Sequence, residues 1–253
     1  MVRTRVIPAL LLRNESLVKT VRFRKFSYVG DPCNSVRIFN ELEVDELLFL
    51  DITATLERRS PNLQVLKDIA SEGFMPMGYG GGIKSVEDAK AIFSIGFEKV
   101  IVNTHGIKNP NFISELASQY GSQAIMISID VKKNIWGHYQ VRSHSGNQTT
   151  KKNPVEWAKE LESLGAGEIL LTSIDQEGSW QGFDLDLVKS VTEAVNIPVI
   201  AHGGAGTIGH IEDVVQKAGA SAVALGSMVV FQKKDMGVLI NFPQKRDLEK
   251  IST

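Results

Sequence analysis

Short apolar runs recur along the chain, and each is followed by a loop and then by a segment with helical periodicity, such as VEDAKAIFSIG or DLDLVKSVTEAV. Strands that alternate with amphipathic helices predict a parallel sheet. Because the runs are apolar nearly throughout, we expect strands buried on both faces. The predicted strands are Arg5–Leu11, Leu47–Ile52, Met75–Tyr79, Lys99–Asn103, Ala124–Asp130, Glu168–Ser173, Pro198–His202 and Ala222–Leu225.

Eight such units in 253 residues predict a (β/α)₈ barrel formed by residues 1–253 as one domain. A doubly wound open sheet is the alternative, since counting strands does not prove closure. An internal repeat favours the barrel: MGYGGGIKSVEDA resembles IAHGGAGTIGHIEDV, with an offset of 122 residues between Gly82 and Gly204. Asn103-Thr104 and Gly226-Ser227 repeat at an offset of 123. The repeat indicates two duplicated half-barrels.

Composition narrows the function classes. The net charge is −1, from 28 Lys and Arg against 29 Asp and Glu, so we expect neither a nucleic-acid nor a membrane partner. The single cysteine, Cys33, excludes an internal disulfide and fits a reducing compartment. The N-terminal apolar run is too short to span a bilayer, and we expect a cytoplasmic protein. The five histidines show no metal-ligand spacing, and we expect no metal and no cofactor.

Paired glycine loops follow two of the predicted strands and precede helices. Glycine there lets backbone N–H groups approach an anion at a helix N-terminus. A tight turn is the alternative for either loop alone, but the pairing at an equal offset favours two phosphate cradles at one barrel mouth. The expected cradle residues are Gly82, Asn103 and Thr104 in the first half, and Gly203, Gly204, Gly226 and Ser227 in the second.

Several segments resemble one family. DELLFLDIT, GGGIKSVEDA, SIDVKK, GAGEILLTSIDQEG and DLDLVKSVTEAVNIPVIAHGGAG are similar to segments of the cyclase subunit of imidazole glycerol phosphate synthase, over about residues 3–237. The resemblance implies a barrel that receives ammonia from a glutaminase subunit and acts on a bisphosphorylated ribulosyl substrate. It implies lyase-type cyclisation in histidine biosynthesis. The isomerase of the same pathway, which acts without glutamine, is the nearest competitor by fold.

The family's chemistry rests on two aspartates, at the ends of the first and fifth strands, that serve as general acid and base. Asp130 ends the fifth strand and matches one of them, although a helix N-cap is the alternative role. The first strand reads VIPALLLRN and places Leu11 where the family has the other aspartate. Leucine transfers no proton, so this departure puts the ring-closing activity in question.

Other family positions are retained. Lys19 matches a substrate-binding lysine, and Arg22, Arg24 and Lys25 make the loop after the first strand basic. Thr172 and Ser145-Gly146 match polar substrate contacts, and Glu177-Gly178 replaces the family's Asp-Gly beside the second phosphate.

Four charged residues stand directly before or at the start of predicted strands, and all four match the family's ammonia gate. They are Arg5, Glu46, Lys99 and Glu168. Two cations and two anions can pair in a ring at the amino-terminal entrance of the barrel, and buried charges require such pairing. Ile7, Ala9, Leu48, Leu50, Ile101 and Leu170 should face inward above them. An apolar lining admits ammonia and disfavours ammonium.

Three functions follow from this combination. The chain either cyclises the family's substrate with Asp130 alone, or relays ammonia to a separate amidotransferase in surface-polysaccharide (lipopolysaccharide) sugar synthesis, or only activates the glutaminase. The ALLL-type first strand resembles that of family paralogues of the second kind, and this resemblance implies the relay of ammonia. In each version the glutaminase docks on the amino-terminal face of the barrel.

Overall fold

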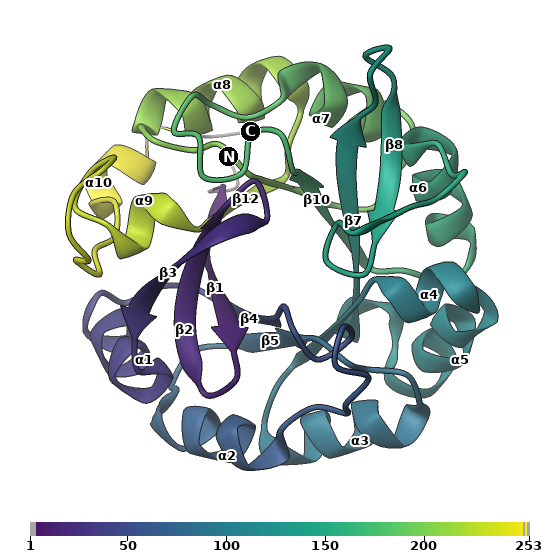
Figure 1. The fold of residues 1–253 in the computed structure, drawn as a ribbon, viewed down its shortest axis with the longest axis horizontal. Helices are drawn as coiled ribbons and strands as arrows, with labels where there is room; N and C mark the ends of the chain where they lie inside the picture. Colours follow the sequence, from purple (N-terminus) through teal and green to yellow (C-terminus); the bar gives the residue numbers. More distant parts are fainter. Residues whose placement is uncertain (1–3, 250, 252–253) are drawn as a thin grey trace.

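Eight parallel strands form a barrel in the computed structural model, which describes residues 4–249 and 251 (Figure 1). The eight predicted strands are all present, with ends that shift by up to three residues. The barrel strands are β1 (Arg5–Arg13), β4 (Leu47–Asp51), β5 (Met77–Gly80), β6 (Lys99–Val102), β7 (Ile125–Lys133), β10 (Glu168–Ser173), β11 (Val199–His202) and β12 (Ala222–Leu225). The first strand is longer than expected by two residues and the fifth by three, because each continues past the barrel into a hairpin.

Strand pairing shows that the sheet is closed. The strands pair in parallel in the order β10, β11, β12, β1, β4, β5, β6 and β7, and β7 pairs with β10 in turn. The β7–β10 contact runs over six residue pairs, from Glu168 opposite Met126 to Ser173 opposite Val131. The open doubly wound sheet is therefore excluded, and the (β/α)₈ barrel is confirmed.

Helices surround the barrel, as Figure 1 shows. The helices are α1 (Pro32–Glu41), α2 (Leu63–Glu72), α3 (Val86–Ile95), α4 (Thr104–Lys108), α5 (Asn111–Tyr120), α6 (Pro154–Ser163), α7 (Leu185–Thr192), α8 (Ile208–Ala218), α9 (Ser227–Val230) and α10 (Lys245–Leu248), with a 3₁₀ turn at Ser122–Ala124. None of the described helices is long and apolar enough to cross a membrane.

The helices α3 and α8 carry the internal repeat and begin and end in the same way. Each begins with a hydroxyl side chain, of Ser85 or Thr207, that accepts a hydrogen bond from a backbone N–H of the first turn. Each ends at a glycine in the left-handed conformation, Gly96 at φ 117° and Gly219 at φ 70°. The duplicated sequence thus produces duplicated helix boundaries.

Strand alternation separates an inner core from an outer one. The inner core is a set of buried apolar side chains inside the barrel, and five of the six residues predicted to face inward belong to it. It comprises Ile7, Ala9, Leu48, Ile101, Met126, Leu170, Ile200, Ala222 and Ala224, with Leu50 packed against it. The barrel needs small residues here as well: a Cβ on Gly78 would lie 2.8 Å from the Leu48 side chain. The inside of the barrel is therefore a packed apolar column.

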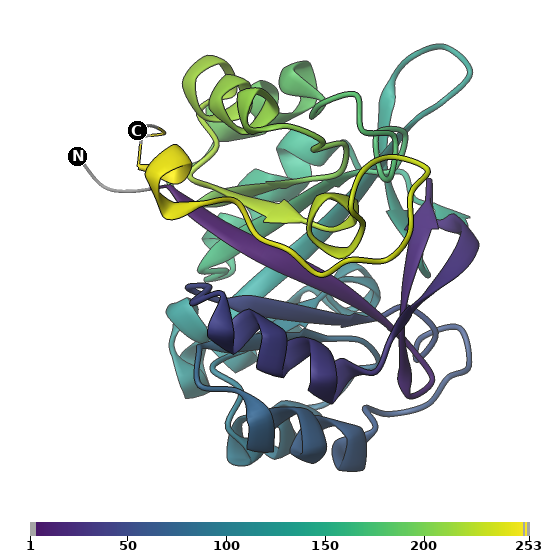
Figure 2. The same cartoon turned by 90° about the vertical axis from the view of Figure 1, so that its left-hand side faces the viewer.

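Two antiparallel extensions rise beyond the barrel on the side away from the described chain ends (Figure 2). One extends β1 through β2 (Ser16–Val21) and β3 (Arg24–Gly30), and the other extends β7 through β8 (Tyr139–Ser143) and β9 (Gln148–Thr149). Both grow from the carboxyl ends of barrel strands, so they flank the end where barrel chemistry is located.

Candidate active site

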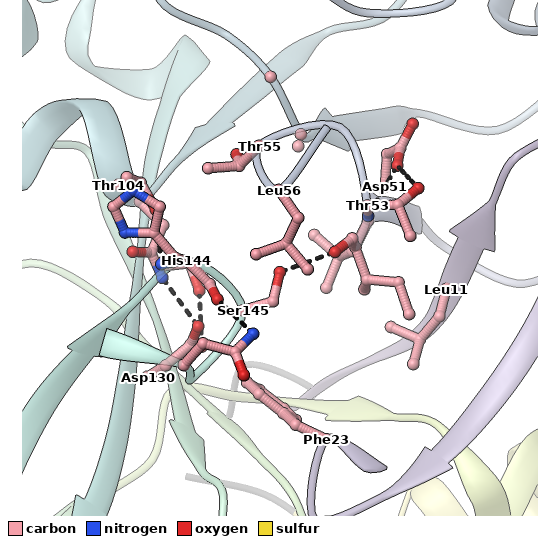
Figure 3. Close-up of a pocket in the computed structure, with 18 of the residues that line it drawn as sticks. Leu11, Phe23, Asp51, Thr53, Thr55, Leu56, Thr104, Asp130, His144 and Ser145 are labelled. Carbon is pink, nitrogen blue, oxygen red and sulfur yellow. Dashed lines mark hydrogen bonds between the residues drawn. The ribbon is translucent and has the colours of Figure 1, made fainter. Parts of the chain in front are cut away.

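A cavity of about 1020 Å³ opens at the carboxyl ends of the barrel strands. Its wall includes strand-end residues from both halves, among them Leu11, Asn103, Asp130 and Thr172. Figure 3 shows Asp130 and Leu11 on opposite sides of this cavity, as expected for the first and fifth strands of an eight-stranded barrel. The cavity is the candidate active site.

Asp130 is buried in a polar setting. Its carboxylate accepts a hydrogen bond from Asn103 Nδ2 at 2.8 Å and another from Ser128 Oγ at 3.2 Å. Burial raises the pKa of Asp130 to about 6, and the bonds from Ser128 and Asn103 oppose that shift. A carboxyl group with a pKa close to neutrality can both accept and donate a proton, which is what general acid–base catalysis requires.

Leu11 faces the same cavity from an apolar wall. Its side chain is buried, and it lies in register with Leu50 of β4, which also lines the cavity. The register of Asp130 with Thr172 on the other side gives the corresponding polar pair. The strand end expected to hold an aspartate therefore presents only hydrocarbon to the cavity.

A second buried carboxylate, Asp51, lines the cavity and did not emerge from the sequence. It follows the apolar run of β4 in the segment FLDIT, which was the available signal. Its oxygens accept bonds from the backbone N–H groups of Thr53 and Ala54, and Arg59 pairs with it at 2.8 Å. Because these donors engage the carboxylate, Asp51 holds the loop after β4 and does not replace an acid at position 11.

The first cradle, formed by Gly82, Asn103 and Thr104, borders the large cavity. Gly82 adopts φ 72°, and a Cβ there would lie 2.7 Å from the Arg59 carbonyl oxygen, so the backbone requires glycine. Thr104 Oγ1 accepts a hydrogen bond from His144 N at 3.0 Å, and Asn103 Oδ1 is buried without a hydrogen-bond partner in the described structure.

Cationic side chains line the cavity near the first cradle. They are Arg24, Lys25, Arg58, Arg59, Lys84 and Lys108. Of the predicted basic loop, Arg24 and Lys25 therefore reach the cavity, whereas Arg22 instead donates from Nε to the carbonyl of Asp175 at 3.1 Å. Ser145, also on the wall, donates to the Ile52 carbonyl at 2.7 Å. The first cradle is open and positively charged, as phosphate binding requires.

The second cradle brings its predicted residues together but leaves little space. Gly178, Gly203, Gly204, Gly226 and Ser227 border a cavity of about 10 Å³, the room of about one water molecule. Packing explains the glycines, since a Cβ on Gly203 would lie 2.7 Å from the Ser173 carbonyl and one on Gly204 would overlap the Gly182 carbonyl. We expected a phosphate site here, and in this structure the side chain of Lys19 takes up the space.

Lys19 and Glu177 form a buried ion pair within the second cradle, with exposed fractions of 5% and 2% for their side chains. Lys19 Nζ also donates to the Thr20 carbonyl at 3.1 Å, and Glu177 Oε2 accepts from Phe23 N at 3.0 Å. Burial lowers the pKa of Lys19 to about 7, whereas the carboxylate in contact with it favours the ammonium form.

His202 lies between the two cavities at the carboxyl ends of the barrel strands. It borders both cavities, and its Nδ1 lies 3.1 Å from Thr172 Oγ1. Burial, reinforced by the nearby Lys19 charge, lowers the pKa of His202 to about 3, so the imidazole is neutral at neutral pH. Within residues 4–249 and 251, no group of three or more His, Cys, Asp or Glu side chains is placed to hold a metal ion.

The four predicted gate residues form a closed ring of ion pairs at the opposite, amino-terminal end of the strands. Arg5 contacts Glu46 at 3.0 Å and Glu168 at 2.5 Å, and Lys99 contacts both glutamates at 2.8 Å. The glutamate side chains are 6% and 12% exposed, so each buried anion has two cationic partners. The apolar inner core separates this ring from the Asp130 cavity.

A duplicated (β/α)₈ barrel with a charged ring at one end and a carboxylate and glycine cradles at the other defines a class of biosynthetic barrel proteins. The model of the family described as "Histidine biosynthesis protein" matches residues 5–235, and the chain belongs to this family, among relatives named as HisF subunits of imidazole glycerol phosphate synthase.

Three relatives illustrate the similarity. The chain is 48% identical over 249 residues to "Putative imidazole glycerol phosphate synthase subunit hisF2" of Pseudomonas aeruginosa. The matched region covers 98% of this chain and 99% of the relative. It is 43% identical to "Putative imidazole glycerol phosphate synthase subunit HisF" of Leptospira borgpetersenii, over 99% of both chains. It is 42% identical to "Imidazole glycerol phosphate synthase subunit HisF" of Alkaliphilus metalliredigens, over 90% of both.

Proposed function

We propose that this chain is the ammonia-using subunit of a glutaminase complex. Ammonia enters through the ring of Arg5, Glu46, Lys99 and Glu168, crosses the inner core and reaches a phosphorylated acceptor in the Asp130 cavity. The observation that carries the proposal is the closed ring of four ion pairs at the barrel entrance, directly below the apolar column.

The charged ring and the apolar inner core favour the passage of a neutral molecule. Hydrocarbon side chains disfavour a charged ammonium ion strongly, whereas neutral ammonia carries no such penalty. The ring covers the amino-terminal end of the apolar column. The long side chains of Arg5 and Lys99 can move apart without disrupting the barrel strands. A ring of this kind therefore selects and admits ammonia at one point.

A glutaminase is the partner that this entrance requires, since ammonia must be made where it enters. It docks on the amino-terminal face, around the ring. The relatives described above are named as subunits of a synthase, which supports a partner subunit for this chain as well.

The chemistry at the other end differs from that of a cyclase with two aspartates. Positioned acid–base catalysis contributes roughly 10²–10⁴-fold to a rate. With Leu11 in place of one partner, Asp130 acts alone on the acceptor. We therefore propose that cyclisation of the family's ribulosyl substrate is slow in this protein.

Relay of ammonia to a separate amidotransferase is a second candidate, favoured by the apolar wall at Leu11. In that case the cavity passes ammonia onward and Asp130 does not touch an acceptor. Asp130→Asn separates the two: it abolishes amination when the acceptor binds in this cavity and leaves amination unchanged when ammonia is only relayed. The relatives described above are named for imidazole glycerol phosphate synthase and not for a polysaccharide pathway.

Lys99→Glu tests the proposed function. It leaves three anions around Arg5, so we expect glutamine-dependent amination to fall much more than binding of the glutaminase. Lys99→Arg, which keeps the positive charge, is the matched control and should retain transfer. The measurement follows ¹⁵N from amide-labelled glutamine into the acceptor against unlabelled ammonium in solution, with calorimetry for binding. If Lys99→Glu transfers ¹⁵N as well as the parent does, the ring is not the entrance.

A further inference from the structure

Lys19 lies across the backbone that would hold an anion in the second cradle. A Cβ placed on Gly226 would lie 2.8 Å from Lys19 Cε and 3.5 Å from Lys19 Nζ, so the side chain runs directly over this strand end. Its ammonium group then meets Glu177, whose side chain is almost fully buried. The backbone N–H groups of the second cradle therefore face Lys19, and Lys19 is already paired with the Glu177 carboxylate.

The length of the Glu177 side chain allows this contact. One of its oxygens pairs with Lys19 and the other accepts from the backbone N–H of Phe23. Its own carbonyl accepts from Arg22 N at 3.0 Å, and a Cβ on Gly178 would lie 2.7 Å from the Thr20 carbonyl, which fixes the glutamate's backbone against the β2–β3 hairpin. An aspartate on the same backbone would be one methylene shorter, and we expect it not to reach both partners.

We infer that Glu177 determines ligand specificity by acting as an internal anion for Lys19, which closes the second cradle and selects a ligand with one phosphate, bound in the first cradle. This rests on the proposed function, because it describes the acceptor in the same cavity. It replaces the expectation of a bisphosphorylated ligand that the paired loops raised. The first cradle has cations and open space, whereas in the second the cation Lys19 is paired with Glu177 and the free volume is about 10 Å³.

Inorganic phosphate is the probe for the test, read as thermal stabilisation of the full chain over a phosphate titration, with ³¹P NMR line width as a second readout. Ligands that bind only the folded state raise its melting temperature by mass action. Thr104→Glu places a carboxylate in the first cradle, where the large cavity has room for it. In the parent background we expect this substitution to abolish the response to phosphate.

Glu177→Asp withdraws the internal anion by one methylene and keeps its charge. In the Thr104→Glu background we expect it to restore a phosphate response, now from the second cradle. Gln176→Glu is the control at the neighbouring position, which leaves the ion pair of Lys19 and Glu177 in place, and it should restore nothing. The inference is overturned if Thr104→Glu alone leaves the response intact, or if the double variant shows none.

Neither result depends on ammonia transfer. A chain that passes the phosphate test and fails the ¹⁵N test would retain the specificity role of Glu177 and lose the proposed function. The reverse pattern would retain the ammonia entrance and remove the specificity role of Glu177.

Discussion

In the first half of the barrel, Gly82, Asn103 and Thr104 border a cavity of about 1020 Å³, whereas in the second half Gly204, Gly226 and Ser227 border one of about 10 Å³. The two halves share their glycine loops and helix boundaries. One difference between them is the buried ion pair of Lys19 and Glu177, which lies in the second cradle. The duplicated backbone pattern therefore determines where a phosphate could bind, and the surrounding side chains determine whether it can.

The strand ends of the two halves also differ in polarity, and here the second half is the more polar one. The first half presents Leu11 and Leu50 to the mouth, and the second half presents Asp130 and Thr172. The half with the open cradle thus lacks the acid, and the half with the acid has the filled cradle. This arrangement suits one ligand that lies across the mouth, with its phosphate in the first half and its reacting atoms near Asp130.

Removal of the lysine from the second half should have the largest effect on stability. Lys19→Met leaves the Glu177 carboxylate buried and unpaired, which costs roughly 3–5 kcal/mol of unfolding free energy. The double variant Lys19→Met/Glu177→Gln should regain most of this loss. Denaturant unfolding measures both. Equal stability of parent and Lys19→Met would show that the pair does not form.

The matched change in the first half is Arg59→Met, which removes the partner of Asp51. Arg59 is 29% exposed, and Asp51 keeps its bonds from Thr53 and Ala54, so we expect a smaller loss of roughly 2 kcal/mol. A loss as large as that of Lys19→Met would contradict the contrast between the halves.

Asp130→Asn should stabilise the protein at alkaline pH. The pKa of Asp130 is about 6 in the folded state and about 3.9 in an unfolded chain, so the folded state binds more protons between these values. Stability from this group therefore falls as pH rises through that window, and the penalty is complete above pH ~6. Two pKa units correspond to roughly 3 kcal/mol as an upper value.

Melting curves at several pH values test this sign. The gain from Asp130→Asn should be present at pH ~8 and nearly absent at pH ~4. Asp51→Asn is the control: this carboxylate is also buried, but it pairs with Arg59, so its loss should destabilise the protein at pH ~8. A gain from Asp130→Asn that does not vary with pH would exclude titration as its cause.

Thr172→Val should have the smallest effect. It removes the hydroxyl that lies 3.1 Å from His202 Nδ1, in a buried position, and keeps the volume nearly constant. We expect a loss of roughly 1 kcal/mol. A chemical denaturation series with Thr172→Ser as control, which keeps the hydroxyl, distinguishes the lost hydrogen bond from lost packing.

The barrel strands were predictable because strands buried on both faces are apolar runs, and the repeat located both glycine loops. The hairpin strands β2 and β3 were not predicted. Four of the seven β3 residues are charged, glycine or small polar, and the strand pairs only with β2 outside the barrel, so no apolar run marks it. The segment was interpreted only as a basic loop.

The site divides in the same way. Asp130 and the ring residues stand at strand ends, where position alone brings them to one mouth or the other. The pair of Lys19 and Glu177 joins residues 158 positions apart, one in strand β2 and the other in the loop after β10, and no local pattern encodes the packing of that strand on that loop. The family resemblance indicated that Glu177 replaces an aspartate. Only the fold shows that the longer side chain of Glu177 reaches Lys19.

The most direct test of the central claim, that this mouth has lost one of two proton-transferring groups, is the rate of cyclisation of the family's ribulosyl substrate with free ammonium, for the parent and for Leu11→Asp. Little or no turnover is expected for the parent. In the Glu177→Asp background, in which the second cradle can accept the second phosphate of this substrate, Leu11→Asp should raise the rate by up to roughly 10²–10⁴-fold, and Asp130→Asn should abolish that gain. A parent that already cyclises the substrate, at a rate that Leu11→Asp leaves unchanged, would contradict the claim.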